Sequence, residues 1–250
     1  MATTDWLNVI AQAARSGAAR VQLIGGEPTL YRDLHVLVSR ALSGGMEVEI
    51  FTNLVHVVPA MWALFERPGV RLATSYYSTD AAEHDAVTGR RSHDRTLANI
   101  REAMLRSIPL RVSVIQMHDQ GVTDAALAEL RALGVRSVGA DRLREIGRGL
   151  RAGRTGPAEL CGRCADGKLA VLPSGDAVPC LLSRWVLLGN VRTGCISDIY
   201  ARSLPTRTAL VAATVATRHE GTCGPDDKCG PDEDGGVCQQ PTCLPHYIGP

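Results

Sequence analysis

The stretch VQLIGGEP, residues 21–28, joins a short apolar run to the loop that follows it. Val21, Leu23 and Ile24 predict a strand that is buried on both faces, as strands of parallel sheets are. The abrupt change from apolar residues to glycine places the end of this strand at a βα connection.

The second half of the stretch carries the candidate chemistry. Gly25 and Gly26 lack Cβ atoms, so a ligand can come close to their backbone. Glu27 adds a carboxylate at the carboxyl end of the strand, where α/β folds bind ligands. Pro28 is expected to stop the strand and to fix the exit of the loop. Without its surroundings, the same pattern also fits a plain tight turn.

Outward from this stretch, strand and helix patterns alternate with short connections up to about residue 145. Strands are expected at 21–24, 48–51, 70–76, 110–116 and 135–138. Helices are expected at 3–16, 33–42, from Pro59 onward, at 94–106 and at 123–133, with Thr3 or Thr4 and Thr123 as caps. Such alternation predicts a parallel α/β sheet or barrel. A full eightfold barrel needs about 250 residues, so a partial barrel or an open doubly wound sheet is predicted.

Composition narrows the class of protein. Apolar residues make up 45% of the 250 residues, which is enough for a globular core. The 27 basic and 26 acidic residues nearly cancel, so nothing favours a nucleic-acid or membrane partner. The sequence has no bilayer-length apolar run and no secretory pattern at residues 1–20, so we expect a cytoplasmic protein.

The eight cysteines all lie between residues 161 and 243. In a cytoplasmic protein, clustered cysteines are more often metal ligands than disulfides. One group contains Cys161, Cys164 and Cys180, and a second contains Cys223, Cys229, Cys238 and Cys243. Zinc and iron–sulfur clusters both use four thiolates, so both remain open. Cys195 stands apart and is expected to be buried, and most of the seven histidines are expected at the surface.

Residues 147–160 are rich in glycine and arginine and mark the expected domain boundary. Beyond it, residues 168–172 and 177–180 flank the turn Pro-Ser-Gly-Asp and predict a hairpin. Residues 204–218 predict a further helix.

These features together resemble radical S-adenosylmethionine (SAM) enzymes with a C-terminal SPASM domain. GGEP at 25–28 resembles their motif for the SAM amino group. The hairpin CADGKLAVLPSGDAVPC, residues 164–180, resembles the opening of SPASM, and residues 188–191 resemble its continuation. His84-Asp85 with Thr88-Gly89-Arg90 resembles the segment in which an arginine pairs the SAM carboxylate.

The resemblance implies a partial (β/α)6 barrel without its first strand at 1–146 and a SPASM-like domain at 147–250. It implies that SAM binds at Gly25, Gly26, Glu27, Pro28, Asn53, Ser75 and Arg90. It also implies auxiliary 4Fe-4S clusters on Cys161, Cys164, Cys180, Cys223, Cys229, Cys238 and Cys243. Other readings stay open for individual residues: Ser75 as a strand end, Asn53 as a turn residue and Arg90 as a solvated surface cation.

The activity that the resemblance implies is hydrogen abstraction from a peptide or protein by a 5′-deoxyadenosyl radical. Peptide maturation is the favoured form, with a reductant such as flavodoxin or ferredoxin. Two alternatives remain: a non-catalytic protein that binds a peptide or a partner enzyme, and a zinc-stabilised α/β protein.

The sequence departs from the family pattern at three points. No cysteine precedes Cys161, so the CxxxCxxC of the radical cluster has no counterpart. The last four cysteines are more widely spaced than usual, and Tyr77 stands where many relatives have aspartate. Because the chain opens on a helix rather than on a strand, we expect an N-terminally truncated form of an active enzyme.

Overall fold

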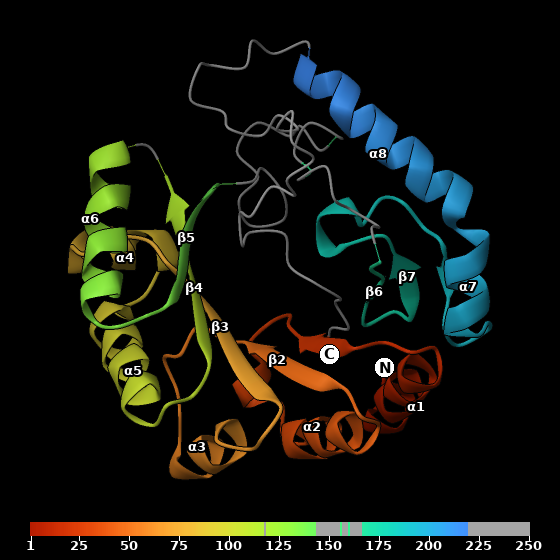
Figure 1. Ribbon diagram of the computed structural model, residues 1–250, viewed down its shortest axis with the longest axis horizontal. Coiled ribbons are helices and arrows are strands. Elements are labelled where there is room, and N and C mark those ends of the chain that lie inside the picture. The colour runs from red at the N-terminus through yellow and green to blue at the C-terminus, as the bar shows by residue number, and fades with distance from the viewer. Residues whose placement is uncertain (118, 144–155, 157–159, 161–166, 220–250) are drawn as a thin grey trace, which may run out of the picture.

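The computed structural model describes residues 1–117, 119–143, 156, 160 and 167–219. Its larger part is a five-stranded parallel sheet whose strands are paired in chain order, and it confirms the predicted α/β class. The strands are β1 (Arg20–Leu23), β2 (Glu47–Phe51), β3 (Val70–Tyr76), β4 (Leu110–Gln116) and β5 (Ser137–Arg142). The sheet curves, and helices cover its convex side (Figure 1).

The helices are α1 (Thr3–Arg15), α2 (Leu34–Ser43), α3 (Pro59–Phe65), α4 (Ala81–Thr88), α5 (His93–Leu105) and α6 (Gln120–Ala132). Alternate strand residues such as Val21, Val48 and Val70 share one row across the sheet and lie in the core. Successive side chains of a strand point to opposite faces, so one face packs on the helices and the other lines the concave side. Helix α4 was not predicted, because His84 is its only buried residue and it has no apolar stripe.

The starts of two helices differ from prediction. Helix α1 is capped by Ala2 rather than by Thr3 or Thr4. The Thr3 hydroxyl instead donates to Asp33 at 2.6 Å, which ties α1 to the start of α2. Helix α6 is capped by Asp119 rather than by Thr123, which lies buried inside the helix. At α6 the Asp119 carboxylate accepts from the Gly121 amide at 2.7 Å, whereas at α1 the Ala2 amide donates to the Asp5 carboxylate at 2.8 Å.

Helices α1, α2, α5 and α6 end in the same way. The second residue after each helix has a positive φ: Gly17, Gly45, Ser107 and Gly134. In each case the next amide donates to the carbonyl five residues earlier, as Ile108 does to Ala103 at 2.9 Å. This closure uses the left-handed conformation that glycine adopts without strain. Helix α5 alone among these four places a serine there.

Replacing Ser107 by glycine is therefore expected to stabilise the protein by about 1 kcal/mol, because Ser107 has φ +56° and is exposed. Thermal unfolding should shift upward by roughly 2–4 °C. Ser43, in the last turn of α2, provides the control: Ser43→Gly should lower the unfolding temperature, because glycine weakens a helix. Equal changes of the unfolding temperature in the two variants would contradict the inference that the positive φ of Ser107 costs stability.

The C-terminal unit, residues 167–219, contains a small antiparallel sheet. Its strands are β6 (Ala170–Val171), β7 (Asp176–Val178) and β8 (Gly189–Asn190), followed by α7 (Ile196–Arg202) and α8 (Leu204–His219). The hairpin predicted across Pro-Ser-Gly-Asp is confirmed, whereas β8 and α7 are additions. The expected boundary at residue 147 lies outside the described residues.

This unit packs against the start of the chain (Figure 1). The Ile196 amide donates to Gln12 of α1 at 2.9 Å, and the Met1 ammonium donates to the Pro173 carbonyl at 2.8 Å. Ile24, directly after β1, packs against the buried side chains of the small sheet. The C-terminal unit therefore supports the strand that leads into the glycine loop.

Cys195 is exposed, contrary to prediction. It occupies the N-cap of α7, and its sulfur lies 3.2 Å from the Ser197 hydroxyl. At a cap position the side chain turns toward the first turn of the helix instead of into the core. No helix in the described part of the chain is long and apolar enough to cross a membrane.

Candidate functional site

The glycine loop after β1 presents its backbone to solvent. The strand ends at Leu23, before the glycines, so Pro28 does not end it. Pro28 instead begins a short 3-10 helix, Pro28–Leu30. Gly25 and Gly26 have φ values of 107° and 52° and are both exposed. A Cβ added to Gly26 would meet no atom within 4 Å, so the space in front of this backbone is open.

Glu27 anchors this loop to the neighbouring strand. Its Oε1 accepts hydrogen bonds from the Thr29 amide at 3.1 Å, the Thr29 hydroxyl at 2.9 Å and the Thr52 hydroxyl at 2.6 Å. Its Oε2 accepts one, from the Asn53 amide at 2.8 Å. A carboxylate has about four lone-pair positions. Because Oε1 is saturated and Oε2 accepts a single bond, Oε2 is the oxygen that can still receive a donor from a ligand.

The turn after β2 is held from a second side by α5. Thr96 donates to the Asn53 carbonyl at 3.0 Å, and Asn99 donates to the Leu54 carbonyl at 2.6 Å. Leu54 is fully buried with φ +54°, a conformation that costs a residue with a side chain some free energy. The Asn53 side chain accepts from the Val55 amide at 2.8 Å, which is the turn role that the sequence left open.

The structure brings Gly25, Gly26, Glu27, Pro28 and Asn53 together at the carboxyl ends of β1 and β2. Among the described residues, neither Ser75 nor Arg90 is hydrogen-bonded to this group, and their expected contacts with SAM stay predictions. Ser75 is half-buried inside β3 and lies opposite Ser113 of β4.

Arg90 is exposed just after α4. Its segment connects to α5 through Asp85, whose carboxylate accepts from the Ser92 and His93 amides at 2.8 and 2.9 Å. These two hydrogen bonds hold the pKa of Asp85 below its usual value. Since α5 also holds the Asn53 turn through Thr96, one helix supports both segments.

A buried polar network that was not predicted lies on the concave face of the sheet. Glu49 of β2 is 2% exposed and accepts a hydrogen bond from Gln22 of β1. Arg111 of β4 donates to Glu49 at 3.1 Å and to Ser113 at 3.1 Å. Arg111 reaches across β3 above Ala73, whose small side chain leaves room for it. The signal in the sequence was a polar or charged residue between apolar neighbours: Gln22, Glu49 and Arg111.

A second missed cluster lies between β3 and the helices. The Tyr76 hydroxyl is 2.9 Å from Nε2 of His93 and donates to Glu129 at 2.8 Å. His84 and His93 are both buried, whereas His35 and His56 are exposed. Nδ1 of His84 is buried without a hydrogen-bond partner.

Burial, with a smaller effect from His93, lowers the pKa of His84 to about 4, while Asp85 acts in the opposite direction. Tyr76 and Tyr77 are its other ring neighbours. In the unfolded chain the imidazole binds a proton below about pH 6.5. Between these values the unfolded state holds more protons, so stability falls as pH falls.

We expect the free energy of unfolding to drop by up to about 3 kcal/mol between about pH 7 and about pH 4 through His84 alone. Urea unfolding at several pH values measures this slope. His84→Phe, which keeps a ring among the aromatic neighbours, should flatten the curve in this window. An unchanged slope in that variant would assign the pH dependence to other groups.

Of the seven predicted thiolate ligands, the structure describes Cys180. Its sulfur is buried and accepts hydrogen bonds from the backbone amide and the hydroxyl of Ser183, the latter at 3.4 Å. The other six, Cys161, Cys164, Cys223, Cys229, Cys238 and Cys243, lie outside the described residues. Within the described residues, no group of three or more His, Cys, Asp or Glu could hold a metal ion.

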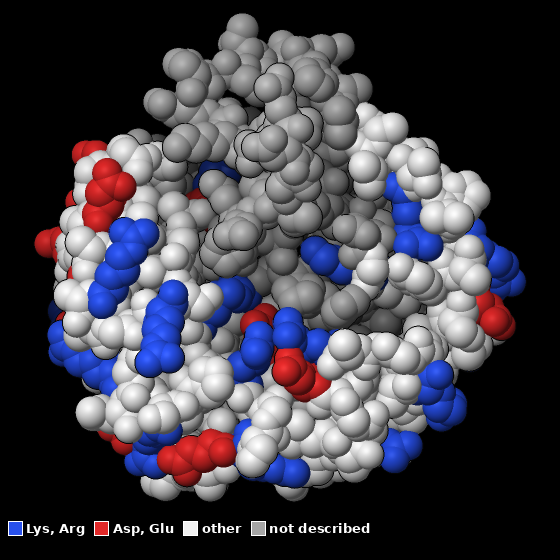
Figure 2. Space-filling view, in the orientation of Figure 1, with Lys and Arg blue, Asp and Glu red and all other residues white. Residues whose placement is uncertain are grey.

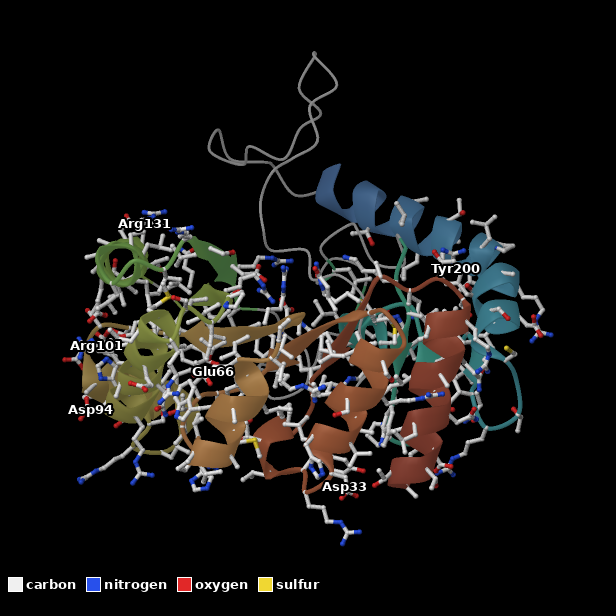
Figure 3. All side chains as sticks on the ribbon, turned by 60° about the horizontal axis from the view of Figure 1, so that its bottom comes forward. Asp33, Glu66, Asp94, Arg101, Arg131 and Tyr200 are labelled. Carbon is white, nitrogen blue, oxygen red and sulfur yellow. The ribbon has the colours of Figure 1, made fainter. Side chains whose placement is uncertain are left out.

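Charged side chains are spread over the surface without a continuous basic area on the face in Figure 2. In the helix layer, Asp94 and Arg101 lie on α5 and Glu66 lies at the end of α3 (Figure 3). A surface hollow of about 440 Å³ near Trp62 and Arg106 also belongs to the helix layer. The glycine loop is thus the site where the open backbone and an available carboxylate coincide.

Comparison with known proteins places this chain in a family. The model of the radical SAM superfamily matches residues 1–134, and the chain belongs to this superfamily. The PqqA peptide cyclase of Rhodopseudomonas palustris is 29% identical over 124 residues, which are 49% of this chain and 33% of that protein. A probable GTP 3′,8-cyclase of Sulfurisphaera tokodaii is 33% identical over 101 residues, 40% of this chain and 32% of that protein.

Solved structures show the same fold. Streptococcus suis SuiB bound to its precursor peptide SuiA has a TM-score of 0.67 at 14% identity, over 79% of this chain and 57% of SuiB. The structure of anSMEcpe with bound AdoMet has a TM-score of 0.61 at 9% identity, over 80% of this chain and 71% of that chain. The chain spans about a third of the length of the curated relatives it matches.

Proposed function

We propose that this chain binds SAM at the glycine loop after β1 and serves in the radical modification of a peptide or protein. The observation that carries the proposal is the Glu27-anchored loop, with open space before Gly26 and an acceptor left on Oε2. The PqqA peptide cyclase and the SuiB–SuiA complex among its relatives support a peptide substrate.

The residues proposed to hold SAM have distinct tasks. Gly25 and Gly26 leave the backbone accessible, and Glu27 Oε2 accepts a charge-assisted hydrogen bond from the amino group. Arg90, which is exposed, pairs the carboxylate of the ligand. Pro28, Asn53 and Ser75 complete the proposed contact set. When bound and reductively cleaved, SAM supplies a 5′-deoxyadenosyl radical, which abstracts hydrogen from the substrate.

We further propose that residues 147–250 form a SPASM-like domain with auxiliary 4Fe-4S clusters on the seven clustered cysteines. The surroundings of Cys180 suit a thiolate, because the Ser183 hydroxyl lies 3.4 Å from its sulfur as well as 3.2 Å from its carbonyl oxygen. The proposal includes a cytoplasmic setting and a one-electron reductant such as flavodoxin or ferredoxin.

A second candidate is a non-catalytic protein that recognises a peptide or a partner enzyme. It is favoured by the absence of cysteine from residues 1–160, which leaves this segment without thiolates for a radical cluster. Cleavage of SAM under strong reductant separates the two candidates, because only the first requires it.

The test combines calorimetry with metal analysis of the 250-residue chain after anaerobic reconstitution. We expect SAM binding, together with iron and sulfide in proportion. Cys180→Ala should lower the iron content, and Cys195→Ala, the exposed cysteine outside both groups, should leave it unchanged. Stoichiometric zinc without sulfide would refute the cluster assignment, and no measurable SAM binding would refute the proposed site.

A further inference from the structure

Thr52, directly after β2, connects the glycine loop to the rest of the fold. It is 1% exposed, although its hydroxyl is polar. That hydroxyl donates to Glu27 Oε1 at 2.6 Å and accepts from the Leu54 amide at 3.2 Å. The hydroxyl therefore acts both as a donor and as an acceptor, and these two hydrogen bonds fix its direction.

The Thr52 hydroxyl and the Asn53 amide fix the orientation of the Glu27 carboxylate. The Thr29 donors come from the same loop as Glu27, so they move with it. The bonds from Thr52 and Asn53 are the ones that connect the carboxylate to β2. Thr52 holds Oε1, so that Oε2, which accepts only from Asn53, remains the oxygen with accepting capacity for a ligand.

The strand-side anchor is itself rigid. The Leu54 amide, which donates to Thr52, belongs to the residue with φ +54°, and Asn99 of α5 holds the Leu54 carbonyl. A strained conformation persists when its surroundings determine it from several sides. The position of the Thr52 hydroxyl is thus set by β2 and by α5 together.

We propose that Thr52 is a positioning residue for the SAM site, acting through Glu27 rather than by touching the ligand. This inference rests on the proposed SAM binding and adds to it a residue outside the predicted contact set. Loss of the hydroxyl leaves Glu27 Oε1 without its shortest hydrogen bond and lets the carboxylate rotate away from the ligand.

The experiment compares SAM affinity by calorimetry in the parent chain, Thr52→Val and Thr52→Ser. Valine keeps the shape and removes the hydroxyl, so SAM should bind about tenfold more weakly, as expected for one hydrogen bond to a charged group. Serine keeps the hydroxyl, and its affinity should return to within about twofold of the parent. A purely structural role of the methyl group would give the opposite order.

Thr74→Val is the matched control, because Thr74 is also fully buried at a strand but has no bond to Glu27. It should leave SAM affinity unchanged. Hydrogen exchange of the Asn53 amide adds a measurement without ligand: it should accelerate in Thr52→Val and not in Thr74→Val.

The outcomes separate this inference from the proposed function. Equal SAM affinity in the parent and Thr52→Val, with the parent binding, overturns the role of Thr52 alone. A parent chain that binds no SAM overturns the proposed function and the positioning role with it. Unchanged exchange at Asn53 in Thr52→Val would show that the hydroxyl does not hold the loop.

Discussion

Arg111→Met is expected to lower the free energy of unfolding by about 3–5 kcal/mol, the cost of leaving a buried charge without its partner. Glu49 is 2% exposed, and its ion pair with Arg111 measures 3.1 Å. Methionine retains apolar contact with Phe51, over which the guanidinium now lies. The loss should therefore come from the unpaired carboxylate. Urea unfolding at about pH 7 measures it.

Two further variants test whether the loss comes from the unpaired carboxylate of Glu49. Glu49→Gln combined with Arg111→Met removes both charges and should recover most of the loss, since Gln22 can still bond to the new amide. Arg106→Met breaks ion pairs with Glu66 and Glu102 at the surface and should cost less than about 1 kcal/mol. A small loss in Arg111→Met, similar to that in Arg106→Met, would mean that Glu49 is solvated.

Glu27→Gln is expected to weaken SAM binding by roughly 10- to 150-fold, the equivalent of about 1.5–3 kcal/mol for a hydrogen bond to a charged group. The glutamine amide carries no negative charge. In either orientation its NH2 group faces the Thr52 hydroxyl or the Asn53 amide, and it cannot accept a hydrogen bond from that donor. The loop therefore loses both its charge and part of its anchor. Calorimetry of the parent and the variant checks the change.

Glu66→Gln supplies the matching charge change at a distance from the loop. Glu66 lies in the helix layer beside Arg106 (Figure 3), and its removal should leave SAM affinity unaltered. Equal weakening in both variants would point to a general effect of net charge. Unaltered affinity in Glu27→Gln would reduce the loop to a plain turn.

The order of strands and helices was predictable because apolar periodicity and glycine breaks are local properties. The strands at 70–76 and 110–116 are confirmed with the predicted bounds. Strand β5 of the parallel sheet spans Ser137–Arg142 rather than the predicted 135–138. The reason is that Val135 belongs to the end of α6, where its amide donates to the Leu130 carbonyl. Local pattern alone cannot assign a residue that both elements could use.

The candidate site was predictable in its parts. GGEP and Asn53 were both singled out, since glycine, acid and amide at strand ends are visible in sequence. Thr52 was not, because a threonine after a strand has no distinctive signal. Only the parallel pairing of β1 and β2, with Leu23 opposite Ile50, brings the Thr52 hydroxyl within hydrogen-bond distance of Glu27. The same applies to Glu49 and Arg111, which are 62 residues apart.

The sequence by itself determined the alternation of strands and helices, the glycine loop and its carboxylate, because each depends on neighbours within a few residues. Tertiary structure decided which oxygen of Glu27 stays available, which charges are buried in pairs and which histidines leave the surface. Those outcomes depend on donors from other strands and helices, and only the packing of the sheet brings them within hydrogen-bond distance.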